Sequence, residues 1–258
     1  MKKLLLLFLP VLLLACSFLY YYNSKPAFDS RTAAAGKAKP VRWVDTHTKQ
    51  TLYHVVIGDS LAKGYGSSQG GYAGIASKQL EAKLQKQVIV DNIAVNGLTT
   101  TGLISLLERP DVKEKLQKAD IITISIGGNN LLRLNRNFGI LEGLKMLDQE
   151  KKKFQADLEH ILLTIRAENK DAVLVLSELY NPLQLEDSIS SYASLFLDGW
   201  NKTIRTAADT YNPAIVLPVR KLIPNDAKEL LYDGVHPNDA GYARIADAFV
   251  QSLLSYKL

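Results

Sequence analysis

Residues 52–61 read Leu-Tyr-His-Val-Val-Ile-Gly-Asp-Ser-Leu, and this stretch decides the fold class. Its first part, residues 52–57, is a short and mostly apolar run rich in β-branched side chains. Such a run is typical of a strand that is buried on both faces of a sheet. Runs of the same kind recur along the chain at residues 88–93, 121–126, 172–177 and 214–219.

The segments between these runs have the spacing of helices. Apolar residues recur every three or four positions over residues 73–86, 144–168, 192–211 and 240–254. Strands that alternate with helices predict an α/β fold, here a doubly wound, flavodoxin-like parallel sheet of five strands with helices on both faces. In such a sheet, functional side chains gather beyond the carboxyl ends of the strands.

Ser60 lies at this edge, directly after the first predicted strand. Near the other end of the chain, Asp233 and His236 stand three positions apart in the segment Asp-Gly-Val-His-Pro. A serine hydroxyl becomes a good nucleophile only when a base takes its proton, and an acid must orient that base. The two segments together predict a serine hydrolase with Ser60 as nucleophile, His236 as base and Asp233 as orienting acid.

Two further segments also follow predicted strands: Asn96-Gly97 and Gly127-Gly128-Asn129-Asn130. With Gly58-Asp59-Ser60-Leu61 and the Asp-Gly-Val-His segment, they make the chain resemble the GDSL esterase/lipase family, the SGNH hydrolases, over roughly residues 52–256. The Gly-x-Ser-x-Gly elbow of other hydrolases is absent.

The resemblance assigns roles to single residues. The Ser, Gly, Asn and His that name the family correspond to Ser60, Gly97, Asn129 and His236, with Asp233 as the orienting acid. This implies an oxyanion hole made by the backbone N–H groups of Ser60 and Gly97 and the side-chain amide of Asn129.

One position departs from the family pattern, because Asn130 stands where an Asp is usual. Asn and Asp are nearly equivalent helix caps. We therefore expect Asn130 to cap the helix or turn after Asn129, and we expect an Asp at this position to be tolerated.

The resemblance implies hydrolysis of carboxylic esters through an acyl-enzyme, without a metal or an organic cofactor. Substrates across the family include lysophospholipids, short acyl esters, thioesters and acetylated sugars, so the implied partner is a small-molecule or lipid ester. The alternative from another functional class is a catalytically inactive surface binding protein on a hydrolase scaffold, because fold does not fix function.

The composition of the chain argues against several other functional classes. The 258 residues carry a net charge of +5, which is too mild and too evenly spread to predict a nucleic-acid partner. One cysteine and no histidines at ligand spacing argue against a zinc or haem site. The glycine-rich residues 64–74 lack the Gly-Lys-Ser/Thr ending of a phosphate-binding loop, which favours a flexible loop beside Ser60.

The N-terminus predicts export. Residues 1–22 begin with Met-Lys-Lys and continue as an apolar run, which is typical of a leader or a membrane anchor. Cys16 ends a Leu-Leu-Ala-Cys segment that resembles a bacterial lipoprotein box, so it is a possible lipidation site; a single transmembrane anchor is the alternative. Residues 23–50 are interpreted as a polar tether and residues 51–258 as the hydrolase domain. Both alternatives place that domain on the extracytoplasmic face of the cytoplasmic membrane.

Overall fold

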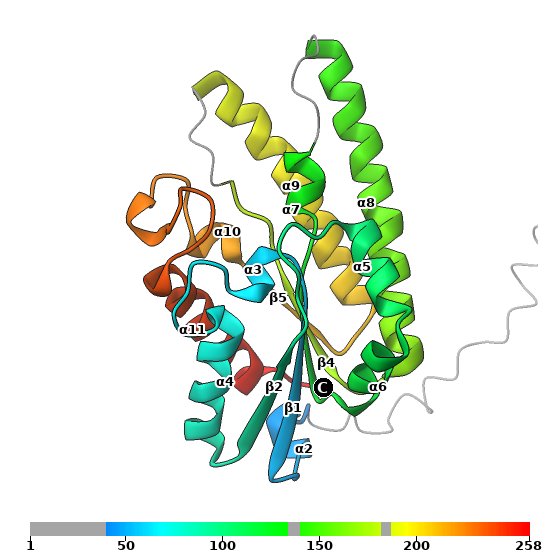
Figure 1. Cartoon of the computed structure of the whole chain (residues 1–258), viewed down its shortest axis with the longest axis vertical. Coiled ribbons are helices and arrows are strands. Elements are labelled where there is room, and N and C mark those ends of the chain that lie inside the picture. Colours follow the sequence, from blue (N-terminus) through cyan, green and yellow to red (C-terminus); the bar gives the residue numbers. More distant parts are fainter. Residues whose placement is uncertain (1–39, 134–139, 182–186) are drawn as a thin grey trace, which may run out of the picture. The chain divides into compact units, whose positions relative to one another are not determined.

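Five parallel strands form one sheet in the order β2-β1-β3-β4-β5, seen near the centre of the computed structural model in Figure 1. The structure describes residues 40–133, 140–181 and 187–258. The strands are β1 (Thr51–Gly58), β2 (Gln87–Asn92), β3 (Ile121–Ser125), β4 (Val173–Ser177) and β5 (Ala214–Leu217). The predicted sheet is confirmed, and each strand begins and ends within two residues of its predicted run.

The strand order sets where the site can lie. The chain runs from β1 to its neighbour β2, then crosses to β3 on the other side of β1 and continues outward to β4 and β5. The direction of winding therefore reverses at β1. In doubly wound sheets, ligands bind beyond the carboxyl ends of the strands where this reversal occurs.

The four predicted helices are present, and further helices lie between them. In the order of the chain, the helices are α2 (Trp43–Thr46), α3 (Ser60–Lys63), α4 (Gly71–Leu84), α5 (Thr100–Leu107), α6 (Pro110–Lys118), α7 (Gly128–Leu132), α8 (Ile140–Glu168), α9 (Asp187–Thr210), α10 (Val219–Leu222), the 3-10 turn η2 (Lys228–Leu230) and α11 (Asp239–Ser255). The pair α5 and α6 was not predicted. Pro110 separates the two, since it lies in the first turn of α6 and has no N–H to continue α5.

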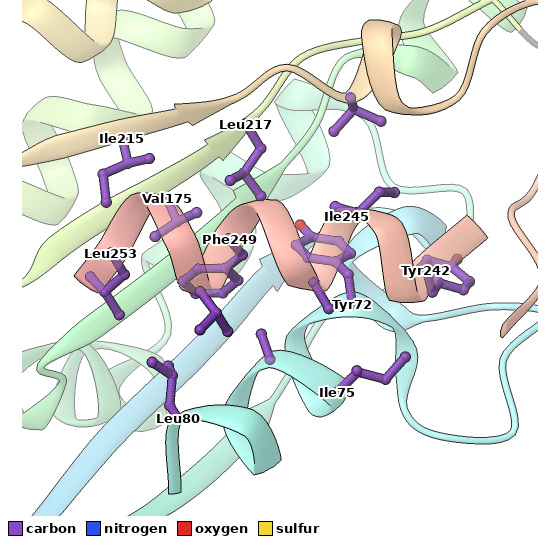
Figure 2. Packing of buried hydrophobic residues seen from close by; sticks show 14 of the residues in the cluster. Tyr72, Ile75, Leu80, Val175, Ile215, Leu217, Tyr242, Ile245, Phe249 and Leu253 are labelled. Atoms are coloured by element: carbon purple, nitrogen blue, oxygen red, sulfur yellow. The ribbon is translucent and has the colours of Figure 1, made fainter. Parts of the chain in front are cut away.

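Helices α4 and α11 cover one face of the sheet (Figure 1). Figure 2 shows α11 lying across the strands, with Phe249 and Leu253 toward Val175 and Ile215. Tyr72 of α4 is fully buried in the same cluster. Burial of this continuous apolar surface is the main favourable contribution to the stability of the α4–α11 layer.

Helices α5, α6, α8 and α9 cover the opposite face (Figure 1). Phe154 of α8 stacks on Trp200 of α9 with ring centroids 4.6 Å apart, and both side chains are fully buried. The carboxyl edge of the sheet, where β1 and β3 end, lies between these two layers.

The boundary of the domain differs from the predicted one. The compact unit begins at Val41, and its first ten residues are not a free tether. Trp43 is only 1% exposed in the core under α11, and its backbone N–H donates to the carbonyl of Tyr256 at 2.8 Å. Lys49 forms an ion pair with the buried Asp120. Long-range contacts with Tyr256 and Asp120, which the local polar composition does not reveal, hold this segment.

The predicted leader, Cys16 and most of the predicted tether lie outside the described residues. Within the described part of the chain, every helix is too short or too polar to cross a bilayer.

Candidate active site

A sharp turn at the end of β1 sets the position of Ser60. Gly58 has φ +123°, and a Cβ there would lie 1.9 Å from the carbonyl oxygen of Ser125, so only glycine fits. Asp59 then caps α3, because its Oδ1 accepts the N–H of Leu61 at 3.1 Å. Ser60 is the first residue of α3, and its own backbone N–H therefore has no acceptor within that helix.

Ser60, His236 and Asp233 form one hydrogen-bonded chain, although the serine and the histidine are 176 positions apart in the sequence. The distance from His236 Nε2 to Ser60 Oγ is 2.8 Å, and the distance from His236 Nδ1 to Asp233 Oδ2 is also 2.8 Å. A carboxylate only accepts, so Nδ1–H donates to Asp233 and Nε2 is left to accept from the serine hydroxyl. This tautomer is the one that a general base beside a serine requires.

A tight loop holds the acid and the imidazole. Asp233 Oδ1 accepts the backbone N–H groups of Val235 and His236 at 3.0 and 2.8 Å, while Tyr232 N–H donates to the carbonyl of His236 at 2.7 Å. From outside the loop, the hydroxyl of Tyr180 donates to the carbonyl of Val235. Burial alone would raise the pKa of Asp233, but the hydrogen bonds from His236 and Val235 outweigh it and lower that pKa. Asp233 therefore stays ionised.

Tyr65 contacts His236, and the sequence did not indicate this. Their ring centroids are 4.7 Å apart at an angle of 59°, and Tyr65 also meets Tyr232 edge to face. The carbonyl of Tyr65 accepts the hydroxyl of Tyr242 at 2.8 Å, which ties the loop to α11. The side chains of Tyr65 and Tyr232 remain 43% and 63% exposed beside the imidazole.

The predicted flexible loop after α3 is anchored. The carboxylate of Asp239 accepts the hydroxyl of Ser67 at 2.7 Å and both the hydroxyl and the N–H of Ser68, at 2.6 and 2.9 Å. Between this loop and the start of α11 lies a surface depression of about 680 Å³. It is lined by Tyr65, Gly66, Ser67, Ser68, Tyr232, Asn238, Asp239 and Ala240.

The two other predicted oxyanion segments leave the sheet at the same junction. The N–H of Val95 donates to the carbonyl of Gly58, and the N–H of Asp59 donates to the carbonyl of Ser125, both at 2.9 Å. Gly97 follows Val95 by two residues, and Asn129 follows Ser125 by four. The backbone therefore brings both segments to the turn that carries the nucleophile.

Cross-links between these segments hold Gly97 and Asn129. The amide Nδ2 of Asn129 donates one N–H to the carbonyl of Leu98 at 3.0 Å and has a second N–H to offer. Arg133 Nη2 donates to the carbonyl of Gly97 at 2.8 Å. Gly97 itself has φ +75°, a conformation that favours glycine.

Asn130 does not cap its own helix, so the expectation for this residue was wrong. The N-cap of α7 is Gly127, which has no side chain, while Asn130 is buried inside the helix. Its Oδ1 instead accepts the N–H of Thr100 at the start of α5, and its Nδ2 donates to Thr100 Oγ1 and to Glu150.

Asp59 is the most strongly perturbed acid beside the nucleophile. Burial raises its pKa from 3.8 to about 6, against the lowering effect of hydrogen bonds from Ser125 and from the backbone of α3. In the described part of the chain, no three His, Cys, Asp or Glu side chains are grouped so that they could hold a metal ion.

Known proteins resemble this chain over most of its length. A family model described as the GDSL-like Lipase/Acylhydrolase family matches residues 56–244. The uncharacterized protein YpmR of Bacillus subtilis (strain 168) is 28% identical over 228 residues, which cover 86% of this chain and 88% of that protein. The spore germination lipase LipC of Bacillus licheniformis is 27% identical over 213 residues, which cover 76% of this chain and 94% of LipC.

A solved lipase structure also resembles this chain. The lipase Lip_vut3 from a goat rumen metagenome superimposes with a TM-score of 0.71 at 25% identity, over 79% of this chain and 98% of that one. The family model spans well over half of the chain. The protein therefore belongs to the GDSL-like lipase/acylhydrolase family and is an ester-hydrolysing enzyme.

Proposed function

We propose that the protein is an extracytoplasmic serine esterase that cleaves carboxylic esters through a Ser60-His236-Asp233 triad and a covalent acyl-enzyme. The observation that carries this proposal is the chain of two 2.8 Å hydrogen bonds from Ser60 Oγ through His236 to Asp233. In this arrangement His236 Nε2 can take the proton of Ser60 Oγ, while Asp233 stays ionised beside Nδ1.

In the first half-reaction, Ser60 Oγ attacks the acyl carbon while His236 Nε2 takes its proton. The electrons of the carbonyl move to its oxygen, where the N–H groups of Ser60 and Gly97 and the amide of Asn129 stabilise the negative charge. The tetrahedral intermediate then collapses: the bond to the alcohol breaks, and Nε2 returns the proton to the leaving oxygen.

The second half-reaction repeats these steps with water. His236 takes a proton from water as the water oxygen attacks the acyl carbon, and Ser60 Oγ leaves with that proton. Asp233 keeps the imidazole in one orientation and stabilises its charged form in both halves.

The alcohol leaves on the side of His236, because Nε2 must reach the departing oxygen. On that side the depression beside Tyr65 and Tyr232 is open to solvent and offers two aromatic rings. We propose that the alcohol part of the ester lies there. Truncating Tyr232 should then change KM when the alcohol is varied and leave the preference for acyl length unchanged.

The N-terminal residues give the proposed location. Residues 1–22 would hold the protein at the membrane, either through a lipid on Cys16 or through an uncleaved apolar anchor. Because the compact unit begins at Val41, the chain that remains as a tether is residues 23–40.

The test is hydrolysis by the purified protein of p-nitrophenyl esters of increasing acyl length, a lysophospholipid and an acetylated sugar. We expect turnover of at least one of these classes and its near-complete loss in Ser60→Ala. An inactive wild-type protein that still binds the esters would favour the binding-protein alternative. Mass spectrometry of the native protein decides the anchor: a lipidated Cys16 at the N-terminus supports processing as a lipoprotein, and an intact Met1 supports the transmembrane anchor.

A further inference from the structure

Asn130 is 8% exposed, and its amide makes three hydrogen bonds that depend on the position of its oxygen and nitrogen. Oδ1 accepts the N–H of Thr100 at 3.1 Å. Nδ2 donates to Thr100 Oγ1 at 3.0 Å and to Glu150 Oε1, on α8, at 2.8 Å. One side chain thereby joins α7, the start of α5 and the middle of α8.

The two groups that face Nδ2 of Asn130, Thr100 Oγ1 and Glu150 Oε1, require a hydrogen-bond donor at that position. The Glu150 carboxylate can only accept. The hydroxyl of Thr100 has one proton, and it donates that proton to Asp157, which Lys153 also contacts. Both partners of Nδ2 therefore present lone pairs. An amide satisfies them, whereas the carboxylate of an Asp would place lone pairs and negative charge against Glu150.

The same contacts border the oxyanion hole. Asn129 and Arg133, at α7, bind the carbonyls of Leu98 and Gly97, and Asn130 binds Thr100 two positions after Leu98. Of these three residues, Asn130 also donates a hydrogen bond to Glu150, which lies on α8. Helix α8 is fixed in turn by the stacking of Phe154 on Trp200.

We propose that Asn130 and Glu150 form a positioning pair that fixes the Asn129 amide and the Gly97 N–H of the oxyanion hole. This inference rests on the proposed function. The pair touches no reacting atom. It sets the distance between two donors whose contribution to catalysis depends on their being held in place before the charge develops.

Asn130→Asp should therefore reduce catalysis, contrary to the expectation from helix capping. Removing an oxyanion donor costs on the order of 10²–10³ in kcat, and displacing one costs less. We expect kcat to fall by roughly 10-fold to 100-fold with KM nearly unchanged, because the donors act only as charge develops.

Glu150→Gln provides the matched variant. In the Glu150→Gln protein, the new amide oxygen still accepts from Asn130, so kcat should stay within about 3-fold of the wild-type value. In the double variant, the new amide nitrogen can donate to the carboxylate introduced at position 130, so Glu150→Gln should restore most of the kcat that Asn130→Asp loses. A merely structural role would lower thermal stability without changing kcat of the folded protein, whereas a positioning role lowers kcat in protein that is still folded at the assay temperature.

The experiment measures kcat and KM, with the ester that the wild type hydrolyses fastest among the panel named above, for the full-length wild type, both single variants and the double variant in the same detergent. Thermal unfolding of each protein serves as the folding control. Wild-type kcat in Asn130→Asp would overturn the proposal, and so would an equal loss in the double variant. If Asn130→Asp does not fold, Glu150→Leu, which removes the acceptor, should lower kcat where Glu150→Gln does not. An inactive wild type would instead count against the proposed function.

Discussion

Replacing Asp59 by Asn should make the stability of the protein less dependent on pH. Asp59 is 5% exposed, and its Oδ1 accepts the hydroxyl of Ser125 and the N–H of Leu61. An Asn oxygen can accept both bonds, so the substitution removes the charge while keeping these contacts. The carboxylate is the part that burial disfavours.

The direction of this pH dependence follows from the raised pKa of Asp59. The unfolded chain releases this proton near pH 3.8, but the folded protein holds it up to about pH 6. Folding therefore takes up a proton between these values, and the stability of the wild type falls as pH rises through this window. The full shift corresponds to about 3 kcal/mol, most of which develops between about pH 4 and pH 7.5. Asp59→Asn lacks this decline.

The assay is urea denaturation of both proteins, followed by circular dichroism, across that pH range. Other titrating groups cancel in the difference, including the buried His54, whose pKa burial lowers to about 3. The difference in unfolding free energy, variant minus wild type, should grow by about 2 kcal/mol from about pH 4 to about pH 7.5.

Asp239→Asn is the control with the opposite sign. Hydrogen bonds from Ser68 and Ser67 lower the pKa of Asp239, so the wild type should gain stability relative to this variant as pH rises. A difference for Asp59→Asn that does not change with pH would refute the reasoning, because it would mean that Asp59 is solvated in the folded protein.

Three further predictions concern the triad, the oxyanion hole and the domain boundary. Asp233→Asn should lower kcat on the order of 10⁴-fold, because an amide facing His236 Nδ1 favours the tautomer whose Nε2–H cannot accept from Ser60. Steady-state kinetics on a p-nitrophenyl ester measures this loss, and a loss below about 10-fold would argue against the role assigned to Asp233. Asn129→Ala should lower kcat by roughly 10²–10³ with KM unchanged, since the amide acts as charge develops; a raised KM alone would instead mean that Asn129 binds the substrate. Trp43→Ala should destabilise the protein by about 3–5 kcal/mol in urea denaturation, because the side chain is buried; an unchanged midpoint would mean that residues 41–50 are a tether after all.

The sheet could be predicted because each strand is marked by the residues of its own short segment. Each strand is a short apolar run, and parallel strands covered on both faces need no polar alternation. Ser60 and Asn129 could be placed at one edge because both closely follow such runs. Asp233 and His236 could be found because their spacing of three residues lets one short loop join acid to base.

The missed features all depend on contacts between distant parts of the chain. Trp43 stands in a polar segment, and its contact with Tyr256 near the C-terminus makes it part of the core. The role of Asn130 depends on the direction of its amide toward Glu150, which lies on another helix. Tyr65 lies among glycines that suggested a mobile loop, whereas the hydroxyl of Tyr242 fixes its backbone.

Covalent labelling tests the central claim, that His236 activates Ser60. The purified protein is treated with a fluorophosphonate, and mass spectrometry then counts and locates the adducts. We expect one adduct on the peptide that contains Ser60, no adduct in Ser60→Ala, and strongly slowed labelling in His236→Ala. An unlabelled wild-type protein, or an adduct that persists in Ser60→Ala, would contradict the account.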